Sequence, residues 1–160
     1  MAQSNFERMI QLADEVFAYR SDPDQISVTE KEREQLENIH PANLSEYNEG
    51  NGPIAWILLI PTTKRVMQDF VAQNISERQL LEETPPGEKY DAIYLCSALV
   101  LEEYRHKGIA LKLSLDAINS IKQEHNITAL YVWPFTDGGD KLAELIADRS
   151  GLPLLRRADL

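Results

Sequence analysis

The chain has 160 residues, of which 43% are hydrophobic and 26% charged, as in an ordinary globular protein. Its net charge of −10 disfavours a nucleic-acid partner, because phosphate binding needs clustered Lys and Arg side chains. No apolar run is long enough to span a bilayer, and the first residues lack the pattern of a secretory signal. A single cysteine, Cys96, excludes an intramolecular disulfide. We therefore expect one domain over residues 1–160 in a reducing cytoplasm, with no membrane partner.

The first 50 residues predict two helices followed by a loop. Apolar residues recur at helical spacing over residues 4–20. Thr29, with Glu32 three residues later, is a capping-box pattern that predicts the start of a second helix, which runs to Ile39. Residues 41–53 are polar and rich in turn-forming residues, so we expect a loop there. This part of the chain, residues 1–50, is expected to be helical.

The middle of the chain predicts one buried strand and two short helices. Residues 54–60 form a near-continuous apolar run that Pro61 ends, as expected for a strand covered on both faces. Residues 63–84 change to helical spacing, and Ser76 with Gln79 opens the second of these helices.

The last 70 residues alternate strands with helices, which predicts an α/β layered domain of the α+β kind. Along the first of these strands, a side-chain period of two predicts that Tyr94 and Ser97 lie on opposite faces. We expect strands over residues 91–101, 129–135 and 152–156, and helices over residues 108–123 and 140–149.

A short basic segment, residues 105–110 (RHKGIA), lies between the strand over 91–101 and the helix that follows. The N-terminus of a helix binds anions, because its first backbone N–H groups are unpaired and carry a partial positive charge. Gly108 lacks the Cβ that would keep a pyrophosphate from the backbone, and Arg105 and Lys107 add positive charge. The pattern differs from G-x-G-x-x-G and from G-x-x-x-x-G-K-[ST], which disfavours a Rossmann site and excludes a P-loop. These features alone leave two readings, an anion site or simply a tight turn that enters a helix.

The stretch ALVLEEYRHKGIALKL resembles motif A of the GNAT superfamily of N-acetyltransferases. That motif is a strand followed by [Q/R]-x-x-G-x-[G/A], which Arg105, Gly108 and Ala110 match here. The resemblance covers residues 90–156, the expected CoA-binding core. Further along, the family often shows N-x-x-A-x-x-x-Y followed by Gly-Phe, and those places are taken here by Asp140, Ala143, Ala147, Gly151 and Leu152.

The resemblance implies a GNAT-like fold, with a mixed, splayed sheet flanked by helices, and acetyl-CoA as cosubstrate. It also implies direct transfer of the acetyl group to a primary amine of a small molecule or peptide, and it allows a homodimer. The family usually has a hairpin before the motif A strand, where residues 63–84 look helical here. The residues that it assigns to acetyl-CoA are Leu99, Val100 and Leu101 for the pantetheine arm, and Arg105, His106, Lys107, Gly108, Ile109 and Ala110 for the pyrophosphate.

The catalytic residues are less well defined, because the family's frequent general acid, a tyrosine, falls on Ala147. A methyl group cannot donate a proton to the leaving thiolate. Tyr131 and Thr136 are the alternative proton donors that we consider. Asp91, at the start of the strand over 91–101, is the candidate general base, although an acid at the entry to a strand is more often simply solvated.

Two further expectations concern ligands. His40, His106 and His125 show no metal-ligand spacing with other residues, so we expect no metal. The missing tyrosine also leaves a rival function open, a GNAT-like module that binds acyl-CoA as a sensor or scaffold without efficient catalysis.

Overall fold

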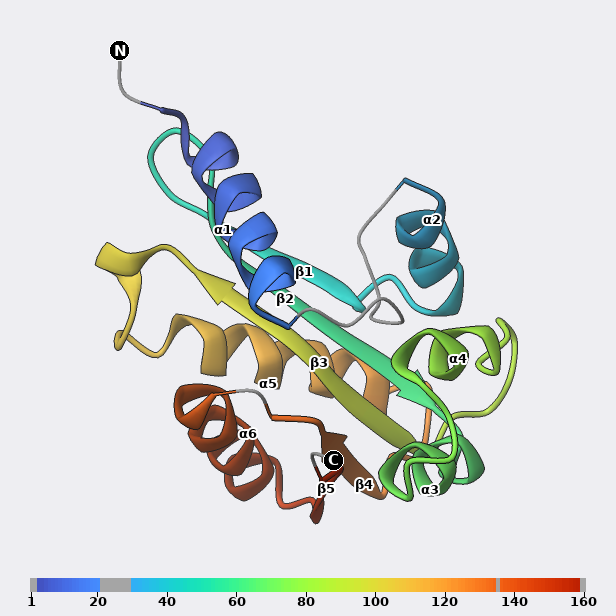
Figure 1. Ribbon diagram of the computed structural model, residues 1–160. Coiled ribbons are helices and arrows are strands. Elements are labelled where there is room, and N and C mark those ends of the chain that lie inside the picture. The colour runs from blue at the N-terminus through green and yellow to red at the C-terminus, as the bar shows by residue number, and fades with distance from the viewer. Residues whose placement is uncertain (1–2, 21–29, 135, 159–160) are drawn as a thin grey trace.

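The computed structural model describes residues 3–20, 30–134 and 136–158 (Figure 1). It has the mixed α/β architecture that the alternation of strands and helices predicts. The elements, in chain order, are α1 (Asn5–Arg20), α2 (Glu30–Ile39), β1 (Leu44–Asn48), β2 (Pro53–Thr62), α3 (Lys64–Val71), α4 (Glu77–Glu82), β3 (Ala92–Val100), the 3₁₀ turn η1 (Glu102–Tyr104), α5 (Ile109–Lys122), β4 (Ala129–Val132), α6 (Asp137–Ser150) and β5 (Leu154–Arg156).

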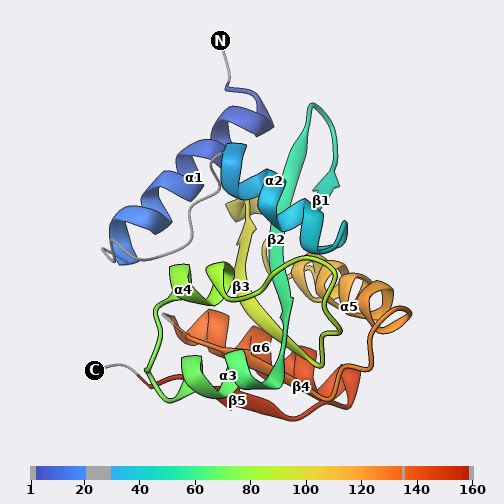
Figure 2. The ribbon, with the colours of Figure 1, turned by 90° about the vertical axis from the view of Figure 1, so that its right-hand side faces the viewer.

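The five strands form one sheet in the order β1-β2-β3-β4-β5. Neighbours from β1 to β3 are antiparallel, and neighbours from β3 to β5 are parallel. Helices α1 and α5 lie on opposite faces of this sheet (Figure 2), and α6 packs against α5. Phe70 of α3 packs on Tyr94, which shares a sheet face with Ile54 beneath α1, so α3 lies on the α1 face.

The helices predicted from apolar spacing are all confirmed, including two short ones between β2 and β3. The predicted capping box of α4 is present: the amide of Gln79 donates to Oγ of Ser76, and the amide of Ser76 donates to Oε1 of Gln79. The expected box at Thr29 lies outside the described residues. None of the described helices is long and apolar enough to cross a membrane.

The expectation of a loop over residues 41–53 is wrong, because Leu44–Asn48 is the edge strand β1. It pairs antiparallel with β2, and Leu44 lies opposite Leu58. Its side chains are half-buried or exposed, since an edge strand contacts a neighbour on one side only and needs little apolar alternation. The strand was therefore hidden by its polar composition.

Pro61 does not end β2, which continues to Thr62. The amide of Leu59 donates to Asn43 before β1, so the backbone of Pro61, two residues later, faces the same side of β2. At Pro61, β2 no longer has β1 beside it, because the last residue of β2 that pairs with β1 is Leu58, opposite Leu44. A residue without an N–H group is tolerated at such an open edge.

Two boundaries in the C-terminal half also differ from the prediction. Strand β4 ends at Val132, and Phe135 lies outside the described residues. Helix α6 begins at Asp137 instead of residue 140, because the hydroxyl of Thr136 accepts a hydrogen bond of 3.0 Å from the amide of Gly139 and caps the helix. The sequence did not predict this first turn, because it contains two glycines and glycine is unfavourable in a helix.

Candidate cofactor site

A β-bulge interrupts β3 at Cys96. Leu58 pairs with Ser97, but the next residue of β2, Leu59, pairs with Leu95, so Cys96 is the extra residue. The pairing of β3 with β4 stops at the same point, because its last rung joins Leu95 to Val132. Within the described part of the chain, β3 from Cys96 to Val100 therefore has a strand partner on one side only, since β4 ends at Val132. The splayed sheet that the resemblance implied is present.

The bulge also overturns one prediction. Tyr94 lies opposite Ile60 and Ser97 lies opposite Leu58, two residues apart on β2. Tyr94 and Ser97 therefore share a face of the sheet instead of lying on opposite faces. The extra residue changes the side-chain alternation, which a period of two in the sequence cannot anticipate.

The open edge of β3 exposes the backbone groups of alternate residues. The amide of Leu101 donates to the carbonyl of Ile54 on β2, at 2.9 Å, so its N–H group is already used. Backbone groups alternate in direction along a strand, so those of Leu99 also face β2, and those of Ala98 and Val100 face the open edge. Of the residues expected to pair with a pantetheine arm, Val100 has its backbone groups at the open edge, whereas those of Leu99 and Leu101 face β2. Ala98, which was not expected, also has its backbone groups at the open edge. The carbonyl of Val100 accepts a hydrogen bond of 2.9 Å from Nε of Arg105.

The turn after β3 leads directly into α5 through Gly108, the N-cap residue of that helix. Gly108 has φ of +78°, in the left-handed region that favours glycine, and a Cβ built there would meet nothing within 4 Å. His106 is also left-handed, with φ of +63°. A positive φ is uncommon for a residue other than glycine, and such backbone strain tends to cluster at ligand sites.

The N-terminus of α5 differs from those of the other helices that follow a strand or turn. Hydroxyl groups of Thr63, Ser76 and Thr136 cap α3, α4 and α6. Gly108 has no side chain that could do the same, and among the described residues no side chain caps α5. The first backbone N–H groups of this helix are therefore available to an acceptor from outside the chain.

The basic side chains beside this helix end are exposed to solvent. Arg105, His106 and Lys107 all lie on the surface. The ammonium of Lys107 lies 5.6 Å from the centre of the Tyr104 ring. The available amides, the left-handed glycine and the cationic side chains of Arg105 and Lys107 together form a cradle that suits a phosphate group.

The predicted catalytic residues do not meet at this turn. Asp91 directly precedes the part of β3 that pairs with both β2 and β4, which we call the closed end of the sheet. Its amide donates to the carbonyl of Thr62. Its Oδ1 is buried and has no hydrogen-bond partner in the described part of the chain. Tyr131 is completely buried, with its hydroxyl 2.7 Å from Oγ1 of the same Thr62. Burial raises the pKa of Tyr131 above its ordinary value of 10.0. Thr136 is occupied in capping α6. Thr62 is thus hydrogen-bonded to both Asp91 and Tyr131, and this contact lies at the closed end of the sheet instead of at the turn.

Ala147, which stands where the family often has a tyrosine, lies in α6. Its side chain is partly buried against the main core, and its carbonyl accepts hydrogen bonds from the amides of Gly151 and Leu152. Neither group can donate a proton.

Sequence reasoning missed a buried carboxylate close to the bulge. Glu77, in the first turn of α4, is completely buried, and its Oε2 accepts a hydrogen bond of 2.5 Å from the hydroxyl of Tyr94. The Tyr94 ring stacks on that of Tyr131, with 5.2 Å between ring centres. An acid in the first turn of a helix is common because it favours the helix dipole, so nothing in the sequence marked Glu77 as buried.

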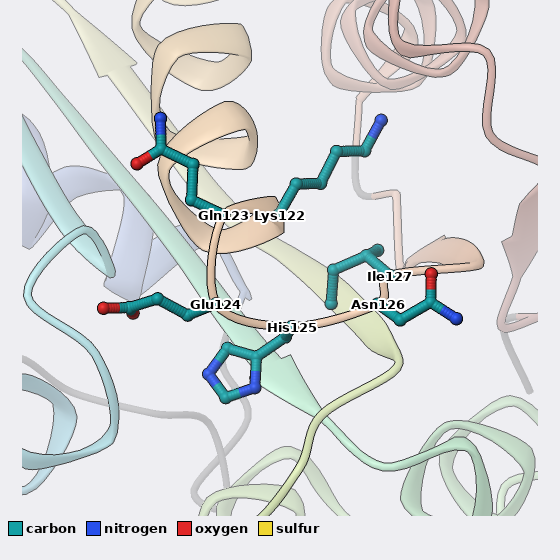
Figure 3. Close-up of a pocket in the computed structure, with 6 residues that line it drawn as sticks. All are labelled: Lys122, Gln123, Glu124, His125, Asn126 and Ile127. Atoms are coloured by element: carbon teal, nitrogen blue, oxygen red, sulfur yellow. The ribbon is translucent and has the colours of Figure 1, made fainter.

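A separate hollow of about 530 Å³ lies at the other end of α5, lined by residues 122–127 (Figure 3). Glu124 and His125 project from this segment, and Oε2 of Glu124 lies 2.5 Å from Nε2 of the buried His40. The C-terminus of a helix carries a partial negative charge, so this hollow does not suit an anion. Among the residues described, no three His, Cys, Asp or Glu side chains are grouped to hold a metal ion.

No protein-family model matches the sequence. No curated protein matches it either. Among solved structures, a chain of "The NatB Acetyltransferase Complex Bound To bisubstrate inhibitor" is similar with a TM-score of 0.46 and 14% identity. The match covers 81% of this chain and 61% of that one, so the present chain spans about three fifths of its length. Similarity at this level does not transfer an activity.

Proposed function

We propose that the chain is a GNAT-type N-acetyltransferase that moves an acetyl group from acetyl-CoA to a primary amine of a small molecule or peptide. The observation that carries the proposal is the junction of two features: an uncapped helix N-terminus with a left-handed glycine, and the open edge of β3 beside it. Val100, near the turn, is five positions after Leu95, the last residue of β3 that pairs with β4. These five positions correspond to about 16 Å of strand. That length suits an extended pantetheine arm.

Each part of the site has a role in this proposal. The amides at the start of α5, with Arg105 and Lys107, hold the pyrophosphate. Backbone groups of Ala98 and Val100 pair with the pantetheine arm, which brings the thioester to the bulge at Cys96. The amine nitrogen attacks the thioester carbonyl there, so the C–N bond forms and the electron pair of the C–S bond leaves with the CoA sulfur. Holding the two reactants together supplies much of the rate enhancement.

The amine must lose a proton and the thiolate must gain one. Of the three candidates, Tyr131 lies nearest the point where the strands diverge, one residue before the last rung. Burial raises its pKa, so the hydroxyl is protonated at neutral pH but donates its proton less readily than that of an exposed tyrosine. Asp91 as base and Thr136 as donor are less favoured by their positions. We place the enzyme in the cytoplasm because its single cysteine, Cys96, cannot form an intramolecular disulfide, and a homodimer stays within the proposal.

A rival function is favoured by a specific observation. Ala147 offers no proton, Asp91 and Tyr131 both contact Thr62, and the hydroxyl of Thr136 caps α6. A domain of this kind could bind acyl-CoA as a sensor or scaffold without efficient transfer. The two functions share the cofactor and differ in turnover.

Binding of acetyl-CoA is tested by thermal unfolding, because a ligand that binds only the folded state raises the melting temperature. We expect a rise for the wild type and none for Gly108→Val. Gly151→Val is the matched control: Gly151 is also left-handed, with φ of +72° and open space around its Cβ, so both variants carry a similar backbone strain. No rise for the wild type at millimolar acetyl-CoA would remove the cofactor from the proposal.

Turnover is then tested by thiol release from acetyl-CoA in the presence of amines, polyamines, aminoglycosides and peptides with free N-termini. Release that depends on one amine class supports the transferase and names its acceptor. Tight binding without release for every class supports the acyl-CoA-binding module instead.

A further inference from the structure

Helix α1 is docked directly onto the turn that leads to α5. The guanidinium of Arg8 forms two parallel hydrogen bonds with Glu103, from Nη1 to Oε2 at 2.7 Å and from Nη2 to Oε1 at 2.6 Å. Glu103 belongs to η1 and lies 95 residues away in the sequence. This fork-to-fork geometry fixes the direction of both side chains, which a single-point contact would not do.

Apolar contacts hold the same two segments together. Met9, next to Arg8, is completely buried in a small cluster with Ile54 and Leu101, and Tyr104 of η1 packs against this cluster. The start of α1 is fixed independently, because Nδ2 of Asn5 donates to the carbonyl of Glu49 at 2.9 Å. These contacts hold the backbone of Arg8 beside η1 independently of the ion pair with Glu103.

The charges of the turn pose a problem for a phosphate ligand. Glu102 and Glu103 come shortly before Arg105 and Lys107 in the chain, and two carboxylates would offset the two cations. A pyrophosphate approaching such a turn would meet little net attraction. Arg8 changes this balance from outside the motif, because it forms an ion pair with one of the two carboxylates.

We propose that Arg8 is a positioning residue of the cofactor site, which cancels the charge of Glu103 so that the turn presents a net positive charge to the pyrophosphate of CoA. This inference rests on the proposed function. It places one determinant of CoA affinity on α1, outside the segment that resembles motif A. The hydrogen bond from Arg8 lowers the pKa of Glu103 to about 2, so the carboxylate keeps its charge well below neutral pH and the guanidinium offsets that charge.

The test uses the opposite signs that the two single variants should show in the Kd of CoA, measured by calorimetry at low salt. Arg8→Ala leaves the carboxylate uncompensated and should weaken binding roughly fivefold. Glu103→Gln leaves the guanidinium uncompensated and should tighten binding by a similar factor. The double variant Arg8→Ala/Glu103→Gln should bind about as well as the wild type. In 0.5 M salt these differences should largely vanish, because screening is strong at that ionic strength.

A purely structural role of the ion pair gives a different pattern. If the pair only held the turn in shape, Arg8→Ala, Glu103→Gln and the double variant would all bind CoA more weakly, and Arg8→Lys would not restore binding. That pattern would overturn the proposal, whereas near-normal binding by Arg8→Lys supports it. Arg33→Ala and Glu37→Gln on α2 make the same charge changes at exposed sites away from the turn, and neither should alter the Kd.

Failure of this proposal can be told from failure of the proposed function. If the wild-type protein does not bind CoA at all, both are wrong. If the wild type binds but the two single variants change the Kd in the same direction, the cofactor assignment stands and only the role of Arg8 is wrong. Unfolding of each variant by urea, measured in the absence of CoA, confirms that the compared proteins are folded.

Discussion

The hydroxyl of Tyr94 donates a hydrogen bond of 2.5 Å to Oε2 of Glu77, and both side chains are completely buried. The bond joins α4 to β3 two residues before the bulge at Cys96. A carboxylate in a protein interior is costly unless hydrogen bonds compensate for the water it has lost. This contact therefore stabilises the segment of β3 from which the sheet begins to splay.

Replacing Tyr94 with Phe should lower the free energy of unfolding by about 1–3 kcal/mol, because a buried carboxyl oxygen loses one donor. Urea unfolding measures the change. Tyr47→Phe is the matched control, since Tyr47 lies on the edge strand β1 and is 40% exposed; we expect a change within about 0.5 kcal/mol there. Equal effects of the two substitutions would mean that the bond to Glu77 contributes little.

Sequence patterns predicted most of the fold because burial imposes a period on the chain. The apolar run of β2 and the apolar positions at helical spacing in α5 correspond to the side chains that face the core. Strand β1 was missed for the same reason. Its neighbour supplies backbone partners on one side and little burial, so Leu44–Asn48 carries no strong period.

The site was predicted unevenly for a different physical reason. The turn around Gly108 depends on local chain geometry, which a short motif specifies well. The bulge at Cys96 arises from a mismatch in register between β2 and β3, and the burial of Glu77 arises from the packing of α4 on the sheet. Both depend on residues distant in the sequence. Tyr131 was placed on the correct strand and Asp91 directly precedes β3, but the side of the bulge on which they lie could not be known from the sequence.

The pH dependence of stability should report on Tyr131. Burial raises the pKa of Tyr131, so the hydroxyl loses its proton more easily in the unfolded chain than in the folded one. The resulting stabilisation is fully present below the ordinary value of 10.0 and is lost as the pH rises above it. Above pH 10 the free energy of unfolding should fall by about 1.4 kcal/mol per pH unit from this group alone.

Thermal or urea unfolding between pH 8 and 11 checks this expectation in the wild type and in Tyr131→Phe. The variant should lose less stability per pH unit at the alkaline end, although Tyr90, whose pKa burial also raises, keeps some of the slope. The exposed Tyr47→Phe variant serves again as control and should follow the wild type. Identical slopes in all three proteins would show that Tyr131 ionises as freely in the fold as in the unfolded chain.

The ionisation of Glu103 gives an independent view of its contact with Arg8. The hydrogen bond from Arg8 lowers the pKa of Glu103 from 4.5 to about 2. The associated stabilisation is present above pH 4.5 and is lost as the pH falls towards 2, and it is small because both side chains are partly exposed. Carboxyl NMR of Glu103 should show this low pKa, and Arg8→Ala should return it towards 4.5. Arg33→Ala should leave it unchanged; a return in that variant too would point to the net charge of the protein instead of the ion pair.

The open edge of β3 allows the pantetheine part of the proposed function to be tested without touching the turn. The backbone N–H of Ala98 faces the opening, so Ala98→Pro removes a donor that β2 does not use. We expect this variant to stay folded and to bind acetyl-CoA at least about fivefold more weakly, since it loses a hydrogen bond and places a ring at the edge.

Glu46→Pro is its matched control. The carbonyl of Asn43 accepts from Leu59, so alternation along β1 points the amide of Glu46 away from β2 and towards solvent. Both substitutions impose the same restriction on φ at an unpaired strand position. Calorimetry with acetyl-CoA should then separate them: Glu46→Pro binds like the wild type and Ala98→Pro does not. If Ala98→Pro binds normally while Gly108→Val fails, the cofactor is held by its pyrophosphate and the arm follows another path than the edge of β3.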